Sequence, residues 1–187
     1  ALLMRGSVKD RLRDFRGAAE DYGSVLEINH RFAWARLYRG MALRELKDYP
    51  AAESEVSVFL EANPDHEDAV YLRSNVRILM GELRGAAADL TKVLSKKPGK
   101  GPAYANRGQA RAALGDKAGA VSDLRKALEL DPTRRDKIQS ALDALAASPV
   151  EEAQAAPVRR EPVSERGGRG EPAPERHTGE EESLFIK

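Results

Sequence analysis

The chain repeats one pattern every 34 residues, and this period restricts its possible folds more than any other feature. In each of four copies an arginine directly precedes a small residue, and a large apolar residue stands six positions after that small residue. An alanine and then a leucine complete the pattern. The aligned positions are Arg5, Arg39, Arg73 and Arg107; Gly6, Gly40, Ser74 and Gly108; Leu12, Leu46, Met80 and Leu114; Ala18, Ala52, Ala86 and Ala120; Leu26, Leu60, Leu94 and Leu128. A period of this length is typical of stacked structural units that pack mainly against their neighbours.

Each copy has the features of two helices joined by a short turn. In the fourth copy, Pro102 suits the first turn of a helix, and Gly115 is a residue that commonly ends one. Asp116 can then cap the start of a second helix. The pair Asp131-Pro132 would stop that helix, because the residue before a proline avoids the helical region. The sequence therefore predicts an all-α solenoid of helix-turn-helix units.

One further helix is predicted after the fourth copy, at residues 135–146. Its apolar residues Ile138, Leu142 and Leu145 share one side at helical spacing, and its other side is polar. An end element with one apolar and one polar face is what closes a repeat array. We therefore interpret this stretch as a C-terminal capping helix, and residues 1–147 as one repeat domain.

The composition changes at Ser148. Residues 148–187 are rich in proline, glutamate and arginine and hold almost no large apolar residues, so they cannot bury enough surface to offset the entropy of ordering. We predict that this tail is disordered. Its end, Leu184-Phe185-Ile186, departs from the composition of the tail and is either a short linear motif or the result of truncation.

Composition limits the classes of protein to which the chain can belong. No apolar run approaches the roughly 18–20 residues that a membrane-spanning helix needs. The sequence has no cysteine, which excludes disulfides and thiolate metal sites. Residues 1–147 hold 25 basic and 21 acidic residues, a milder excess than nucleic-acid binding usually requires. We expect a cytoplasmic protein; a periplasmic one stays open, because the chain starts inside a repeat and we expect residues upstream.

The aligned positions resemble the tetratricopeptide repeat, a 34-residue helix pair with small residues at fixed places and a closing proline. Three copies end on Pro64, Pro98 and Pro132, whereas the first has His30 instead. The resemblance implies a right-handed solenoid and covers the repeat array together with its end helix. It places the repeats at 1–32, 33–66, 67–100 and 101–134.

One departure from the family pattern concerns the arginine column, where many members have leucine. An acidic residue follows each arginine 16 positions later, so that the two would face each other across the helix pair. The predicted pairs are Arg5 with Asp21, Arg39 with Glu55, Arg73 with Asp89, and Arg107 with Asp123. We interpret them as a structural ladder of ion pairs, since the arginine fork can bind a carboxylate twice. The alternative is that the arginines form a row that binds external anions. The acids disfavour this, because they would already be paired with the arginines.

In the resembled family the first helix of each repeat lines a concave groove that binds a peptide or a helix of another protein. The corresponding candidate partner-binding residues are Trp34, Leu37, Tyr38, Met41, Tyr71, Asn75, Asn106 and Gln109. Aromatic residues and methionine suit such contacts, and asparagine can bind an extended backbone. The alternative is that Trp34, Leu37 and Tyr38 only pack against the first repeat. Some members hold the C-terminal carboxylate of chaperone peptides with lysine and arginine, and the equivalent positions here lack those cations.

No motif for catalysis, cofactor binding or metal binding is present. His30, His66 and His177 lack second ligands at a suitable spacing, so no metal site is predicted. The sequence thus predicts a non-enzymatic scaffold that binds another protein and takes no cofactor or small-molecule substrate. One alternative is a targeting or regulatory module of a larger, truncated enzyme. A weaker one is nucleic-acid binding, suggested by the short Arg-Gly stretch at 166–170.

Overall fold

The structure, a computed structural model, describes residues 1–147, which belong to one compact unit. The predicted disordered tail and its Leu184-Phe185-Ile186 end lie outside the described residues. The described part is helical and contains no strand. Its helices are α1 (Leu2–Arg11), α2 (Phe15–Ile28), α3 (Ala33–Glu45), α4 (Tyr49–Ala62), α5 (Glu67–Met80), α6 (Leu83–Lys96), α7 (Gly101–Ala113), α8 (Lys117–Leu130) and α9 (Arg135–Ala147), with a short 3₁₀ turn, η1, at Pro132–Arg134.

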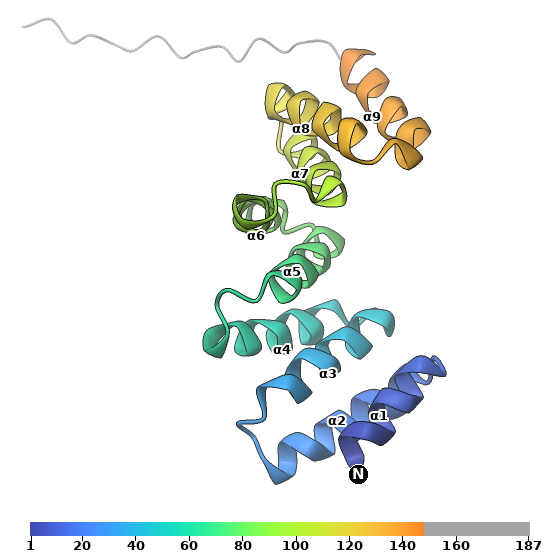
Figure 1. The fold of residues 1–187 in the computed structure, drawn as a ribbon, viewed down its shortest axis with the longest axis vertical. Coiled ribbons are helices and arrows are strands. Elements are labelled where there is room, and N and C mark those ends of the chain that lie inside the picture. The colour runs from blue at the N-terminus through green and yellow to red at the C-terminus, as the bar shows by residue number, and fades with distance from the viewer. Residues whose placement is uncertain (148–187) are drawn as a thin grey trace, which may run out of the picture. The chain divides into compact units, whose positions relative to one another are not determined.

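The helices stack in chain order, from α1 at one end to α9 at the other (Figure 1). Each helix packs against the helices before and after it. The first helices of successive repeats also contact one another, α3 with α5, α5 with α7, and α7 with α9. Within residues 1–147, no two second helices share a comparable contact. The first helices therefore form the tighter, inner layer of the stack, and the second helices form the outer layer.

The small residues of the repeat pattern lie where helices approach one another. The alanines of the fourth column, Ala18, Ala52, Ala86 and Ala120, are all completely buried. The largest core cluster runs through the second and third repeats and includes Val56, Phe59, Val76 and Leu90. The predicted end helix packs through Ile138 against Leu124 and Ala127 of α8, with Leu142 and Leu145 beside it. No helix of the described part is long and apolar enough to cross a bilayer.

Carboxylates cap three of the four second helices. The side chains of Asp14, Asp48 and Asp116 each accept a hydrogen bond from the backbone N–H three residues later. Glu82 stands in the same place before α6 but forms no such cap. Its longer side chain reaches instead toward Arg77, with a carboxylate oxygen 3.8 Å from Nε. The aspartate therefore fits this turn better than glutamate does.

The turn between the two helices of each repeat needs a left-handed backbone at one fixed position. Gly81 and Gly115 adopt φ values of 79° and 86° there. The equivalent residues in the first two repeats are Arg13 and Lys47, with φ values of 63° and 64°. A residue with a Cβ atom is strained in this region, whereas glycine is not.

We expect Lys47→Gly to stabilise the fold by up to about 1 kcal/mol, because relief of the left-handed strain outweighs the extra freedom of glycine in the unfolded chain. Urea unfolding at neutral pH measures the difference. Gly81→Ala is the matched reverse change, since a Cβ atom there would meet nothing within 4 Å and only the backbone is affected. A destabilised Lys47→Gly variant would show that the lysine side chain matters more than its backbone angle.

Candidate protein-binding groove

All four arginine–acid pairs of the repeat pattern are in contact. In each pair the arginine comes from the first helix of a repeat and the acid from the second. The shortest nitrogen–oxygen distances are 2.6 Å for Arg5–Asp21, 2.9 Å for Arg39–Glu55, 2.7 Å for Arg73–Asp89 and 2.8 Å for Arg107–Asp123. The three aspartates are buried. Each accepts two hydrogen bonds from its arginine, through Nε and Nη2.

A second cation contacts each acid, which the sequence reasoning missed. Lys9, Arg77 and Arg111 contact Asp21, Asp89 and Asp123 at 3.1, 2.8 and 2.7 Å. These cations stand four residues after the ladder arginine, a signal that was visible in the aligned repeats. The second repeat has Leu43 at this position, and Arg36 contacts Glu55 at 3.1 Å instead.

Two of the ladder arginines also bond to the preceding repeat. Arg73 Nη1 donates to the Ser57 hydroxyl at 3.2 Å, and Arg107 Nη1 donates to the Thr91 hydroxyl at 3.0 Å. In the first repeat the same column holds Gly23, which has no hydroxyl to offer Arg39. The Nε of Arg39 is buried and has no hydrogen-bond partner among the described residues. The ladder thus joins helices within repeats and, at two junctions, the repeats themselves.

The ladder makes one clear prediction about pH. Hydrogen bonds from Arg5, together with the charge of Lys9, lower the pKa of Asp21 from 3.8 to about 2. A carboxylate with a depressed pKa stabilises the fold above its unfolded pKa, and that contribution disappears as the pH falls through the folded value. The wild type should therefore lose more stability between pH 4 and pH 2 than Asp21→Asn loses. Urea unfolding between pH 4 and pH 2 gives the free energy of unfolding of both proteins. Parallel pH profiles would contradict a lowered pKa for Asp21.

The inner layer of helices carries a half-exposed aromatic stripe on α3. Trp34 is 45% exposed, and its ring lies 5.4 Å from that of Phe59, 5.5 Å from that of His66 and 6.2 Å from that of Tyr38. Tyr38 in turn lies 5.7 Å from Tyr22 of the first repeat. Trp34 is therefore supported by its own repeat, whereas Tyr38 also rests on the first repeat. Both keep part of their surface free, as does Met41.

Leu37 differs from the expectation for a groove residue. It is only 6% exposed and belongs to the central core cluster, together with buried residues of α4 and α5. Its edge still helps to line a small cavity of about 190 Å³ on the inner layer. The cavity is lined by Leu37, Met41, Arg44, Asp68, Tyr71, Leu72 and Asn75.

The polar candidate residues lie on α5 and α7. The Asn106 side-chain amide donates to the Asn75 oxygen at 2.7 Å and to the Tyr71 hydroxyl at 3.3 Å. These three residues therefore form one connected group between repeats three and four. Gln109 is exposed one turn further along α7. The ammonium of Lys100 lies over the Tyr71 ring, 4.0 Å from its centroid.

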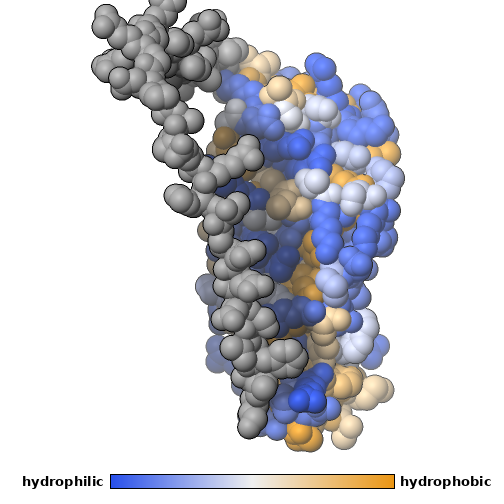
Figure 2. All heavy atoms as spheres, turned by 90° about the vertical axis from the view of Figure 1, so that its left-hand side faces the viewer, coloured by the Kyte–Doolittle hydropathy of each residue, from blue (hydrophilic) through white to orange (hydrophobic). Residues whose placement is uncertain are grey.

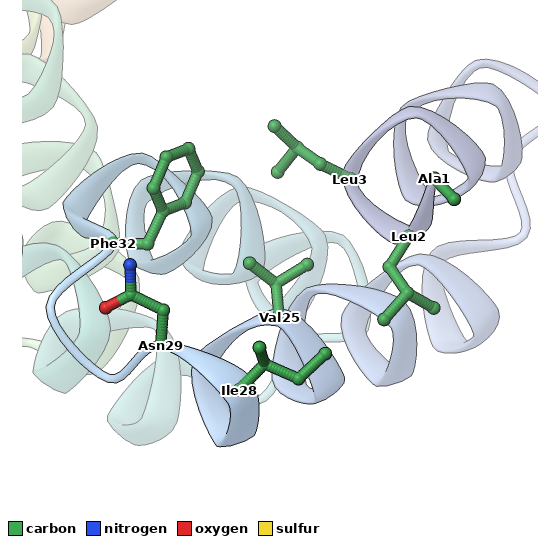
Figure 3. Close-up of a pocket in the computed structure, with 7 residues that line it drawn as sticks. All are labelled: Ala1, Leu2, Leu3, Val25, Ile28, Asn29 and Phe32. Atoms are coloured by element: carbon green, nitrogen blue, oxygen red, sulfur yellow. The ribbon is translucent and has the colours of Figure 1, made fainter.

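A pocket of about 440 Å³ that was not predicted from the sequence lies at the N-terminal end of the described residues. It is lined by Ala1, Leu2, Leu3, Val25, Ile28, Asn29 and Phe32 (Figure 3). Hydrophobic residues gather near this end on the face shown in Figure 2. Val8 on α1, which does not line this pocket, is also 46% exposed. Its equivalents Ala42, Val76 and Ala110 are covered by the preceding repeat and are at most 1% exposed. The described residues hold no group of three acidic or histidine side chains placed to bind a metal ion.

Comparison with known proteins agrees with this geometry. The tetratricopeptide repeat family model matches residues 101–134, which are α7, α8 and the turns around them. No curated protein sequence matches the chain.

Three solved structures show similar folds. The structure of MamA residues 41 to the end from Desulfovibrio magneticus RS-1 aligns with a TM-score of 0.73 and 21% identity, over 77% of this chain and 81% of that one. The Arabidopsis OM64 TPR domain aligns with a TM-score of 0.57 and 23% identity, over 60% of this chain and 93% of that one. The first TPR of Spaghetti (RPAP3), bound to the HSP90 peptide SRMEEVD, aligns with a TM-score of 0.57 and 21% identity, over 61% of this chain and 90% of that one.

The pairing of helices, the match at residues 101–134 and the likeness of these folds lead to one conclusion. Residues 101–134 match the tetratricopeptide repeat, and the described residues have the fold of a solenoid of that type.

Proposed function

We propose that the chain is a protein-interaction scaffold that holds a peptide or a helix of another protein on the inner layer formed by α3, α5 and α7. The observation that carries the proposal is the combination of half-exposed Trp34, Tyr38 and Met41 with the cavity beside Tyr71. Aromatic and methionine side chains that are rigidly supported but only partly covered are common at the centres of protein interfaces.

The rest of the inner layer fits the same role. Asn75, Asn106 and Gln109 continue from the apolar stripe as a neutral polar surface. The hydrogen bonds between Asn106, Asn75 and Tyr71 leave each amide group with unused bonding capacity, which a partner backbone can take up. A solved tetratricopeptide relative, Spaghetti (RPAP3), carries a bound peptide, so the fold is compatible with this use.

The ion-pair ladder serves the proposed function indirectly. Arginine and acid side chains tie the first helices to the second helices in every repeat. Because each ladder arginine is paired with an acid, few unpaired cationic groups remain in the ladder to bind an external anion. The ladder therefore supports a rigid binding surface that partners use without refolding it.

Trp34→Ala and Tyr71→Ala should each weaken binding of an identified partner by roughly thirtyfold, the typical effect of truncating an anchor residue. The partner is first recovered with the full chain by affinity capture and identified by mass spectrometry. Affinities are then measured for folded variants, with circular dichroism as the check on folding. Val58→Ala on α4 is the control, because it removes a partly exposed apolar side chain from a second helix. Wild-type affinity in both groove variants would contradict the proposal.

A further inference from the structure

We propose that the groove selects a segment with a basic residue near an apolar one, and that the partner's cation takes the place of the Lys100 ammonium on Tyr71. This inference rests on the proposed function and names the chemistry of the partner. The free protein itself shows a cation bound at this position, 4.0 Å from the Tyr71 ring centroid.

The position is built from two groups on one face of α5. Tyr71 offers the negative face of its ring, and Asp68, one turn earlier, offers a carboxylate oxygen 3.4 Å from the same ammonium. An aromatic face beside a carboxylate is a favourable site for an ammonium or a guanidinium group. The chemistry of the site therefore matches a lysine or an arginine.

Lys100 is held in this site only weakly and can leave it. The Lys100 side chain is 23% exposed and that of Asp68 is 74% exposed, and an ion pair with one partner this open to solvent contributes little. Lys100 precedes α7, and its backbone carbonyl accepts hydrogen bonds from Ala103 and Tyr104. These bonds do not involve the side chain, so the ammonium can be displaced without opening the turn.

The same two groups border the apolar cavity. Asp68 and Tyr71 line it together with Leu37, Met41 and Leu72. A partner can therefore place an apolar side chain in the cavity and a cation on Tyr71 at the same time. In an extended segment these two side chains would be two residues apart, because alternate residues share one face.

The charges near the cavity favour a cation over an anion. Arg44, the cation among the residues that line the cavity, is paired with Glu45. An acidic segment would meet the Asp68 carboxylate at the cavity, while the cation that lines it, Arg44, is already paired.

The test uses the full chain and four synthetic probe peptides. Three have the sequences GSLSKSG, GSLSQSG and GSLSESG and differ only in the charge two residues after the leucine. The fourth is SRMEEVD, the peptide that Spaghetti (RPAP3) holds. Binding is followed by NMR chemical-shift titration of the isotope-labelled protein, in wild type and in Lys100→Ala.

Lys100→Ala should strengthen binding of the lysine probe by about fivefold to tenfold, the range expected for a partly desolvated cation–aromatic contact. The affinity for the glutamine probe should stay unchanged. Adding Asp68→Asn to Lys100→Ala should remove most of that gain. Equal effects on the lysine and glutamine probes would overturn the inference, as would preferential binding of GSLSESG or SRMEEVD, or no detectable binding of the lysine probe to Lys100→Ala.

The outcome is distinguishable from failure of the proposed function. If a captured partner depends on Trp34 but its binding segment contains no basic residue, or Lys100→Ala leaves its affinity unchanged, the scaffold function stands and this inference is wrong. If the captured partner binds Trp34→Ala and Tyr71→Ala like wild type, the groove itself is not used and both proposals fail.

Discussion

Replacement of Asp123 by alanine should destabilise the protein by about 3 kcal/mol, because it would strip a buried carboxylate from two arginines. The Asp123 side chain is 4% exposed and contacts Arg107 at 2.8 Å and Arg111 at 2.7 Å. The Arg107 side chain is itself only 13% exposed, so its guanidinium would remain largely buried without an ionic partner.

Urea unfolding at neutral pH measures this loss. Glu129→Ala is the matched control, since it breaks the pair with Lys126 on the same helix, where the two side chains are 65% and 48% exposed. An open pair of this kind is worth less than about 1 kcal/mol. Equal losses in the two variants would show that Asp123 behaves as an ordinary surface residue.

Replacement of Gly40 by valine should cost about 3 kcal/mol, because it would force α3 and α4 apart. A Cβ atom at Gly40 would lie 2.7 Å from Val56 Cγ2 and 3.2 Å from the Ala52 backbone oxygen. Val56 can rotate its side chain away, whereas the Ala52 backbone oxygen moves only when α4 moves. The small residue in this column of the repeat therefore sets the distance between the paired helices.

Gly23→Val on α2 separates this packing effect from the helix propensity of valine. A Cβ atom at Gly23 would meet only the Arg39 guanidinium, at 3.8 Å or more, which is ordinary contact. We expect its free energy of unfolding to lie within about 1 kcal/mol of the wild-type value, because the new contact is ordinary and valine is no worse a helix former than glycine. A similar loss in Gly40→Val and Gly23→Val would mean that close approach of α3 and α4 is not the cause.

The fold could be predicted from the sequence because its information is local and periodic. The 34-residue spacing, the aspartates before the second helices and the glycines in the turns each act within a few residues of their position. The ladder was predictable for the same reason, since each arginine and its acid are always 16 residues apart.

Other features depend on contacts between repeats or on side-chain length, which spacing alone does not reveal. The Nε of Arg39 has no partner because Arg39 reaches Glu55 through Nη1, whereas the other ladder arginines use Nε and Nη2 on an aspartate. Leu37 was assigned to the groove from the family pattern, but packing against neighbouring repeats buries it. The position of Lys100 over Tyr71 joins residues 29 positions apart and is not implied by the repeat.

The N-terminal pocket is a different kind of omission. The apolar residues Leu2 and Leu3 were visible in the sequence, but in a repeat array such residues are normally covered by the preceding unit. Val8, outside this pocket, is exposed although its equivalents in the later repeats are buried. A sequence reading that treats all copies as equivalent cannot see this difference.

The fluorescence of Trp34 tests the central claim most directly, because this residue is the one tryptophan of the sequence and lies on the proposed binding surface. The captured partner, or a tryptophan-free segment of it, is titrated into the full chain while Trp34 emission is recorded, and binding is measured in parallel by calorimetry. The account predicts a shift of the emission to shorter wavelength that saturates with binding, because the partner covers the exposed 45% of the side chain. Saturable binding with unchanged Trp34 emission would contradict it.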